Sequence, residues 1–428
     1  MQAHPVQLVV EDDLRRNRLT VFFRILLAIP HLIWVFLWTI ATFFVAIVTW
    51  VMTLIAGHPP AALHRFMCSY IRYVTHLEAY LHLVGNPYPG FVGEEGEYPI
   101  DLRLPEPGPQ SRVRTLFRIF LVLPALVISG VLLGGGSYSA SSKGSSGSAR
   151  YSSGGLAAAI AVLGWFASLV RGKMPKGLRD AGAYSLGYTA QTLAYLLFVT
   201  DRYPYADPTA MLDGVEPPPE HVVHLVRDPE DLRLSRLTVF FRLLLAIPHI
   251  IWLWLWAIAV FFTVIVQWFI TLFGGTPAAG LHRFLSKFVR QALHVYAYIT
   301  LAANLFPGFS GETGVYPIDL VLPEPGRQNR WKTGFRLVLV IPASIVSSAL
   351  SSALFAAAVL TWFVALARGS APAGLRNLSA YALRYGAQVN AYILLLTDAY
   401  PHASPLEGVP EPQLALEITP DAPEPVAG

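Results

Sequence analysis

Long apolar runs alternate along this chain with short segments in which polar residues return. One run, from Ile25 to His64, contains no Asp, Glu, Lys or Arg. A single helical crossing of a bilayer needs about 20 apolar residues, so this run is long enough to span a membrane. Similar runs follow Arg118, Arg242 and Arg336. The pattern therefore predicts a membrane protein built mainly from helices.

Each run begins and ends with a recurring sequence motif, called a phrase below. The opening phrase is Phe-Arg, five residues and Pro, with the arginines at Arg24, Arg118, Arg242 and Arg336. The closing phrase is Ala-Tyr and then, a few residues later, Asn or Asp, one residue, an aromatic residue and Pro. Its tyrosines are Tyr80, Tyr195, Tyr298 and Tyr392. Four copies of one order of signals indicate four repeated helical units.

The four units form two homologous halves. The first half contains a Gly/Ser tract. Residues that precede this tract recur 218 positions later, as Arg24 does at Arg242. Residues that follow it recur 197 positions later, as Trp165 does at Trp362. The difference, 218 minus 197, makes the tract at 134–155 an insertion of 21 residues that the fourth unit lacks. We predict a mobile loop there.

The predicted domains follow from these repeats. The first half is 1–216, with units 1–108 and 109–216. The second half is 217–401, with units 217–326 and 327–401. The tail 402–428 is rich in Pro and acidic residues and is predicted to be disordered.

A short segment before each unit alternates apolar and polar residues, as a β-strand does. The four segments lie near Val6, near Val223, at 98–104 and at 316–322. We expect them to pair in one small sheet. That sheet must lie outside the bilayer, because unpaired strand edges in lipid would leave backbone groups without hydrogen bonds. Each unit then crosses the membrane an even number of times, and both termini share a side.

Two arrangements of a unit satisfy this condition. In one, the apolar run is a single kinked crossing and the tyrosine-rich second helix returns; in the other, the run is itself a hairpin and the second helix lies in the interface. Basic residues at both ends of each run favour the hairpin. Residues 31–56 and 249–273 contain no Gly, Pro or Asn for a turn, which favours one crossing. Both arrangements stay open, and both give an all-α multi-pass membrane protein with short extramembrane strands.

Composition and charge agree with a membrane location. Apolar residues make up 54% of the chain and charged residues 14%, whereas an ordinary soluble domain carries about 25% charge. Arginines gather at the ends of the runs, which predicts contact with anionic headgroups and puts both termini in the cytoplasm. No basic face continues along a soluble domain, so nucleic-acid binding is not expected. The single Cys68 excludes an intramolecular disulfide.

The order of these phrases resembles a family of bacterial membrane proteins. Phe-Arg-x5-Pro, the apolar run, Gly-x-(x)-Pro, Leu-x-Arg, Ala-Tyr and aromatic-Pro are similar to the family named domain of unknown function 4389, in tandem copies over nearly the whole chain. The resemblance implies a bacterial membrane protein, which we place in the cytoplasmic membrane. It brings no catalytic residues.

A few ionisable residues are candidates for a functional site. The four opening arginines, Arg24, Arg118, Arg242 and Arg336, are predicted to be snorkelling anchors at lipid headgroups. Arg72, His76 and Glu78 form a dense ionisable group near an apolar face and could mark a polar path through the membrane. Asp101 and Glu106 are predicted to be solvated surface acids. The recurring His31 and His64 are read as polar residues that meet headgroups or backbone carbonyls.

The usable sequence motifs of serine hydrolases, zinc proteases, P-loop proteins and dinucleotide-binding proteins are missing. We therefore predict an integral membrane protein without cofactor, metal or catalytic residues. It would be a non-enzymatic scaffold or partner-binding subunit, with the bilayer and a membrane or cytoplasmic protein as partners. The alternatives are a transporter or channel built from internal repeats and, third, a lipid-acting enzyme.

Overall fold

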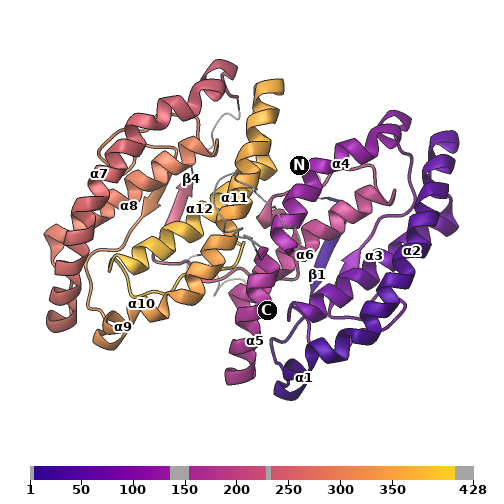
Figure 1. The fold of residues 1–428 in the computed structure, drawn as a ribbon, viewed down its shortest axis with the longest axis horizontal. Coiled ribbons are helices and arrows are strands. Elements are labelled where there is room, and N and C mark those ends of the chain that lie inside the picture. The colour runs from indigo at the N-terminus through magenta and orange to yellow at the C-terminus, as the bar shows by residue number, and fades with distance from the viewer. Residues whose placement is uncertain (1–3, 135–153, 228–232, 410–428) are drawn as a thin grey trace, which may run out of the picture.

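A computed structural model describes residues 4–134, 154–227 and 233–409 (Figure 1). The helices of the first half are α1 (Arg18–Phe22), α2 (Arg24–Ala56), α3 (Ala61–Leu81), α4 (Arg112–Leu133), α5 (Leu156–Arg171) and α6 (Lys176–Leu196). Those of the second half are α7 (Arg236–Gly274), α8 (Ala279–Ile299), α9 (Arg330–Gly334), α10 (Arg336–Leu339), α11 (Ile341–Arg368) and α12 (Ala373–Ile393). A short 3-10 helix, η1 (Pro208–Ala210), precedes the link between the halves.

The short strands form two sheets. The strands are β1 (Gln7–Val10), β2 (Ile100–Arg103), β3 (Leu212–Asp213), β4 (His224–Arg227) and β5 (Ile318–Val321). The first sheet has the order β2-β1-β3 and the second pairs β4 with β5. The expected single sheet of four strands is therefore wrong. The reason is local: β1 and β2 pair antiparallel, with Leu8 opposite Leu102, and pack on helices of their own half, as β4 and β5 do in the other half.

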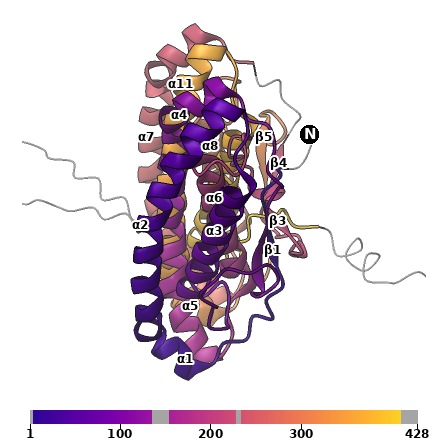
Figure 2. The same cartoon turned by 90° about the vertical axis from the view of Figure 1, so that its right-hand side faces the viewer.

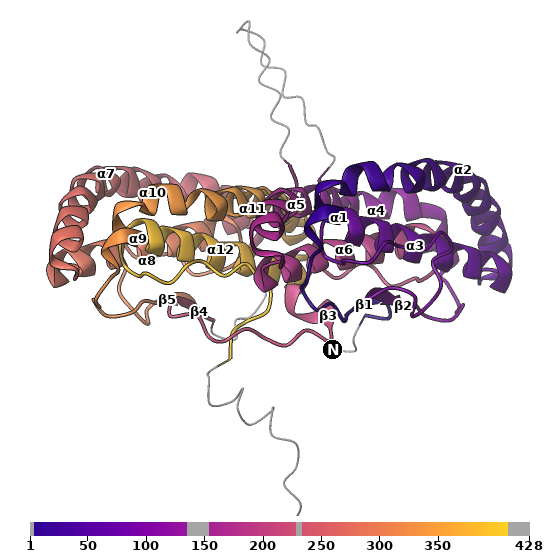
Figure 3. The ribbon, with the colours of Figure 1, turned by 90° about the horizontal axis from the view of Figure 1, so that it is seen from below.

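The elements stack in three layers, which Figure 3 shows edge-on. The long helices α2, α4, α5, α7 and α11 make the first layer, α3, α6, α8 and α12 make the second, and both sheets lie on the far side of the second layer. Figure 2 shows that the strands lie alongside the helices rather than beyond the helix ends. All five strands therefore share one face of the protein.

The long apolar runs of the first and third units are continuous helices, and the run of the fourth unit is continuous from Ile341. α2 has 33 residues, α7 has 39 and α11 has 28, so the hairpin arrangement is wrong for these runs. In the second unit the run divides into α4 and α5 at the Gly/Ser tract. The two ends meet there, because a Cβ placed on Gly155 would lie 2.2 Å from the backbone nitrogen of Gly134. The predicted mobility of this tract concerns 135–153, outside the described residues.

The long helices turn their polar side inward. The inward positions of α2 are Arg24, Ala28, His31, Thr42, Thr49 and Thr53, and those of α7 include Arg242, His249, Gln267 and Thr271. The outward positions of α2 carry large apolar side chains, among them Ile25, Phe36 and Ile55, which are 79%, 64% and 70% exposed. A surface helix in water has the opposite distribution. The outer face of this layer is therefore suited to hydrocarbon.

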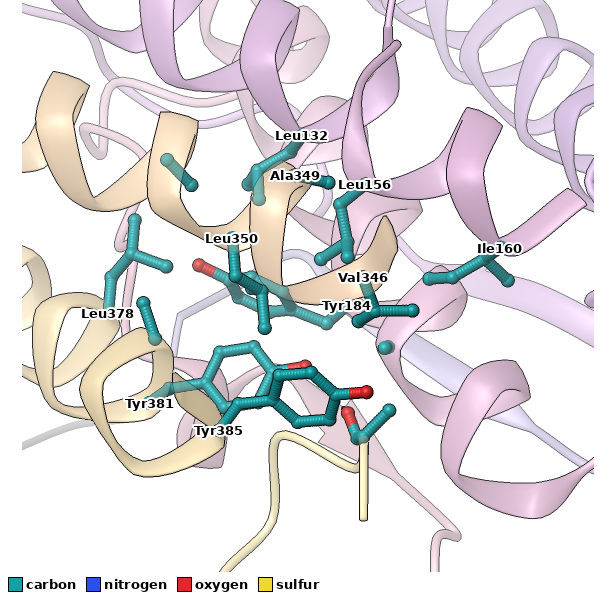
Figure 4. Packing of buried hydrophobic residues seen from close by; sticks show 14 of the residues in the cluster. Leu132, Leu156, Ile160, Tyr184, Val346, Ala349, Leu350, Leu378, Tyr381 and Tyr385 are labelled. Atoms are coloured by element: carbon teal, nitrogen blue, oxygen red, sulfur yellow. Dashed lines mark hydrogen bonds between the residues drawn. The ribbon is translucent and has the colours of Figure 1, made fainter. Parts of the chain in front are cut away.

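The largest apolar core joins the two halves. It brings side chains of α4 and α5 against α11, with α6 and α12 beneath them (Figure 4). Tyr184 and Tyr381 meet edge to face in this core, with ring centroids 6.2 Å apart. Their hydroxyls donate to the carbonyl oxygens of Ala206 and Ala403, at 2.9 and 2.6 Å. The two halves therefore share one interior.

The beginning of the predicted disordered tail is ordered. Ser404 is fully buried, and its Oγ donates to Oδ2 of Asp180 at 3.0 Å. Val409 forms a parallel bridge with Pro219. Residues 402–409 thus gain burial and hydrogen bonds from the rest of the protein, which the composition of the segment does not reveal. The remainder, 410–428, lies outside the described residues.

Deleting the Gly/Ser insertion should leave the fold intact. We expect a chain without 134–154 to keep its melting temperature within a few degrees, because Leu133 and Gly155 already meet and the fourth unit uses an unbroken helix at this place. Circular dichroism in detergent measures this. A control deletion of 348–351, inside α11, should lower the melting temperature strongly. Equal losses from both deletions would contradict the prediction.

Candidate functional site

The four opening arginines point into the protein. Their exposed fractions are 3% for Arg24, 1% for Arg118, 2% for Arg242 and 2% for Arg336. Each guanidinium carbon lies 4.2–4.6 Å from the ring centroid of the closing tyrosine of its unit, an arrangement that allows cation–π attraction. The tyrosines are Tyr80, Tyr195, Tyr298 and Tyr392. The opening and closing phrases of every unit therefore meet in space.

Each arginine also binds backbone carbonyls at the end of the second helix of its unit or in the loop just after it. Arg118 Nη1 donates to the carbonyl oxygens of Tyr195 and Thr200, at 2.7 and 3.3 Å, and its Nη2 lies 2.9 Å from Oδ1 of Asp201. Arg336 makes the matching contacts in the fourth unit. A guanidinium suits this place, because the end of a helix concentrates unpaired carbonyls and partial negative charge.

The chain creates this cluster of carbonyls with a left-handed residue. The second helices end just before Leu83, Phe198, Leu301 and Leu395, which all have φ of 61°. A positive φ turns the chain sharply after the helix, so that successive carbonyls face the arginine. We name this recurring unit of arginine, tyrosine and helix end the arginine clasp. The predicted role of these arginines as headgroup anchors is wrong, since burial removes them from headgroups.

Arg72 and His76 do come together, but with an acid that the sequence analysis placed on the surface. His76 Nε2 lies 3.1 Å from Oδ1 of Asp101, and Arg72 Nε lies 3.0 Å from the same oxygen. The second half repeats the set as Arg290, His294 and Asp319, at 3.2 and 3.1 Å. These sets tie β2 to α3 and β5 to α8.

Backbone groups complete the surroundings of each acid. Asp101 accepts from the amides of Gly96 and Leu102, at 2.6 and 2.7 Å. Burial alone would raise the pKa of Asp101, but the hydrogen bonds from His76 and these amides outweigh it and hold that pKa below its ordinary value. Asp319 behaves in the same way. The acid is therefore ionised and satisfied by internal donors.

Glu78 does not join this set. Its Oε2 lies 3.1 Å from Nδ1 of His82, one turn further along the chain. The structure therefore does not bring Arg72, His76 and Glu78 together as the predicted polar path. A sign of the true set was present in the sequence: Arg72, His76 and Asp101 all recur 218 positions later, whereas Tyr296 replaces Glu78.

The other recurring histidines also have internal contacts. His31 Nδ1 lies 2.8 Å from the hydroxyl of Tyr73, and its ring stacks on Phe91 at a centroid distance of 4.2 Å. His64 Nε2 lies 3.3 Å from the carbonyl oxygen of Val199, which links α3 to the end of the next unit. Within residues 4–134, 154–227 and 233–409, no group of three or more His, Cys, Asp or Glu side chains could hold a metal ion.

A cavity of about 830 Å³ lies in the second half. Its walls come from α7 and α11 and its floor from α8 and α12, which are visible between the two long helices in Figure 1. The lining is mainly apolar, with Leu293, Leu354 and Trp362 among its residues. Because the exposed Leu243 and Phe355 of the outer layer also line it, the cavity opens on the apolar face.

Four segments of the chain match the family described as Domain of unknown function (DUF4389). They are 18–92, 151–206, 236–310 and 330–404. The second match begins near the end of the Gly/Ser insertion, and the other three include the opening arginine of their units. Searches of curated proteins and of solved structures give no match to this chain.

Removing a clasp arginine should destabilise the protein. Arg118→Leu leaves the carbonyls of Tyr195 and Thr200 and the carboxylate of Asp201 without their cation, at a cost of about 3 kcal/mol. Arg118→Lys should restore only part of this stability, since an ammonium cannot stack and bind these groups together. The measurement is thermal unfolding in detergent. Arg65→Gln, at an exposed position, is the control and should change little. If Arg118→Leu lowered the melting temperature no more than Arg65→Gln does, the arginine clasp would not hold the unit together.

Stability should fall at low pH through Asp101 and Asp319. The pKa of each acid in the folded state lies below its ordinary value. Their contribution to the free energy of unfolding is therefore complete above about pH 4 and is lost as the pH falls through the lowered pKa. We expect the double variant Asp101→Asn, Asp319→Asn to be less stable at pH 7 and to lose less between pH 5 and pH 2.5. The control is Glu106→Gln, at an exposed position. If the stability of the double variant depended on pH as strongly as that of the wild type, the loss of stability at low pH would not come from these two acids.

Proposed function

Since this chain belongs to the family described as Domain of unknown function (DUF4389), in four tandem copies, and that description assigns no activity, we propose its function from its geometry. The protein is a non-enzymatic membrane scaffold. Its layer of long helices holds it in the bacterial cytoplasmic membrane, and the opposite, strand-bearing side presents a surface to a membrane or cytoplasmic protein.

The observation that carries this proposal is the inverted polarity of the long helices. Their inward stripes hold Arg, His, Gln and Thr, while large apolar side chains cover the outer face. Four of these helices, α2, α4, α7 and α11, are long and apolar enough to span a membrane. An outer face of this size would drive aggregation in water, and a bilayer supplies the apolar solvent that it needs.

The use of the recurring polar residues supports a scaffold over a transporter. The opening arginines bind helix ends, His64 binds a carbonyl, and Arg72 and His76 bind Asp101. A solute path needs polar groups that line a cavity. The large cavity of the second half is mainly apolar and opens on the apolar face, where lipid chains are its natural occupants.

The orientation is part of the proposal. All described strands lie on one face, and exposed arginines such as Arg15, Arg18, Arg112 and Arg114 stand at the unit openings. Basic residues beside apolar segments favour the cytoplasmic side. We therefore place the strands and both termini in the cytoplasm.

Two measurements on reconstituted protein test the proposal. The protein should stay in the membrane fraction through extraction with alkaline carbonate, because its outer face is solvated by lipid. Vesicles that contain it should release trapped ions and small solutes no faster than empty vesicles. Release into the soluble fraction would refute the membrane assignment. A flux that scales with the protein content of the vesicles would replace the scaffold with the transport alternative.

A further inference from the structure

We infer that the layer of long helices lies within one leaflet, roughly parallel to the membrane surface, instead of crossing the bilayer. The inference rests on the membrane attachment proposed above and specifies how that attachment is made. Helix length does not decide between the two placements. α2, α4, α7 and α11 could each cross by length and composition, so the decision depends on what surrounds each helix.

Most of the large exposed apolar side chains lie on the long helices, and only a few, such as Val226 and Val321, lie on the strands. Large exposed apolar residues follow α2 from end to end, as Ile25, Phe36, Phe43 and Ile55 show. The opposite side of the same helix packs on α3, and α3 packs on β2. A bundle that crosses a bilayer needs an apolar surface on all sides at the level of the hydrocarbon. A protein that lies in one leaflet needs it on one face, which is where most of it lies here.

An acidic loop lies beside the middle of a long helix in the second half. Trp252 stands three residues from the midpoint of α7, and its Nε1 donates to the carbonyl oxygen of Phe309 at 2.9 Å. Glu312 follows three residues later and is exposed. Three residues reach at most about 10 Å. If α7 crossed the membrane with its midpoint at the bilayer centre, this carboxylate would therefore lie within the hydrocarbon core, which is about 30 Å thick.

The first half repeats this arrangement. Trp34 Nε1 donates to the carbonyl oxygen of Phe91 at 2.8 Å, and Glu94, Glu95 and Glu97 follow on the exposed part of that loop. An ionised side chain at membrane depth is costly. In the leaflet placement the same tryptophans lie at the edge of the apolar layer, the position that tryptophan favours at a membrane interface. The acids then face water.

The strands give an independent argument. Figure 2 shows β1 and β4 alongside the helices, within the span of α2. Crossing helices would carry these sheets into the hydrocarbon, where open edges cannot be satisfied. With the long helices parallel to the surface, the second layer separates the sheets from lipid. The cavity under α7 and α11 then opens toward acyl chains.

The two placements predict different sides for the turn between α2 and α3. His58 lies in this turn and is exposed, and Arg15 lies before α1 and is also exposed. A crossing α2 puts these positions on opposite sides of the membrane. An α2 within one leaflet puts both on the cytoplasmic side. Thr276 occupies the position of His58 in the second half and is exposed as well.

Single cysteines at these positions test the inference. The variants Arg15→Cys, His58→Cys and Thr276→Cys are made in a Cys68→Ser background and labelled with an impermeant maleimide, in intact cells and in inverted membrane vesicles. We expect all three to react at least tenfold more in inverted vesicles than in intact cells. Reaction of His58→Cys and Thr276→Cys from outside intact cells, with Arg15→Cys protected, would overturn the inference in favour of crossing helices.

Carbonate extraction of the same membranes separates the two claims. Variants that are washed out would refute the membrane scaffold itself. Variants that stay in the membrane but label on opposite sides would refute only the placement in one leaflet. A thermal unfolding curve for each purified variant excludes those that do not fold. If His58→Cys fails this check, Thr276→Cys carries the test in the other half.

Discussion

The structure depends on one constraint, that the long helices keep their polar side inside and their apolar side outside. The inward stripe of α2 supplies Arg24 and His31 to partners on α3 and the loops that follow it. The same stripe in α7 supplies Arg242 and His249 to the matching places. Internal polar contacts of this kind are strong when water is excluded on the other side of the helix. The outer face therefore needs hydrocarbon, and the layered shape follows from that need.

The arginine clasp explains why the units repeat with so little variation. A guanidinium from the first helix reaches the end of the second, stacks on a tyrosine and binds converging carbonyls, with an aspartate added in the second and fourth units. It ties the start of the first helix to the end of the second. A buried cation of this kind is costly unless each of these partners is in place, so the opening and closing phrases have to occur together.

Much of the fold could be predicted from the sequence. Periodicity and repetition identify four units, apolar helices and short strands. Burial could not be predicted, because Arg24 and Asp101 look like surface charges until the helix ends and strands that bind them are known. The pairing of strands within each half, rather than in one sheet, depends on packing between layers. The order of residues 402–409 depends on contacts with the distant Asp180. These features all come from tertiary contacts, which hydrophobic periodicity does not encode.

The most direct test of this account is a nitroxide scan along the outer face of α2 in lipid vesicles. Spin labels would replace exposed residues that follow one another along the helix, namely Ile29, Ile33, Phe36, Ile40, Phe43, Ile47 and Ile55. Power saturation with oxygen and a water-soluble nickel chelate reports the depth of each label in the bilayer. A helix within one leaflet should leave all seven labels on the same side of the bilayer centre. A depth that rises to the bilayer centre near Ile40 and falls again toward Ile55 would show that α2 crosses the membrane and would contradict the account.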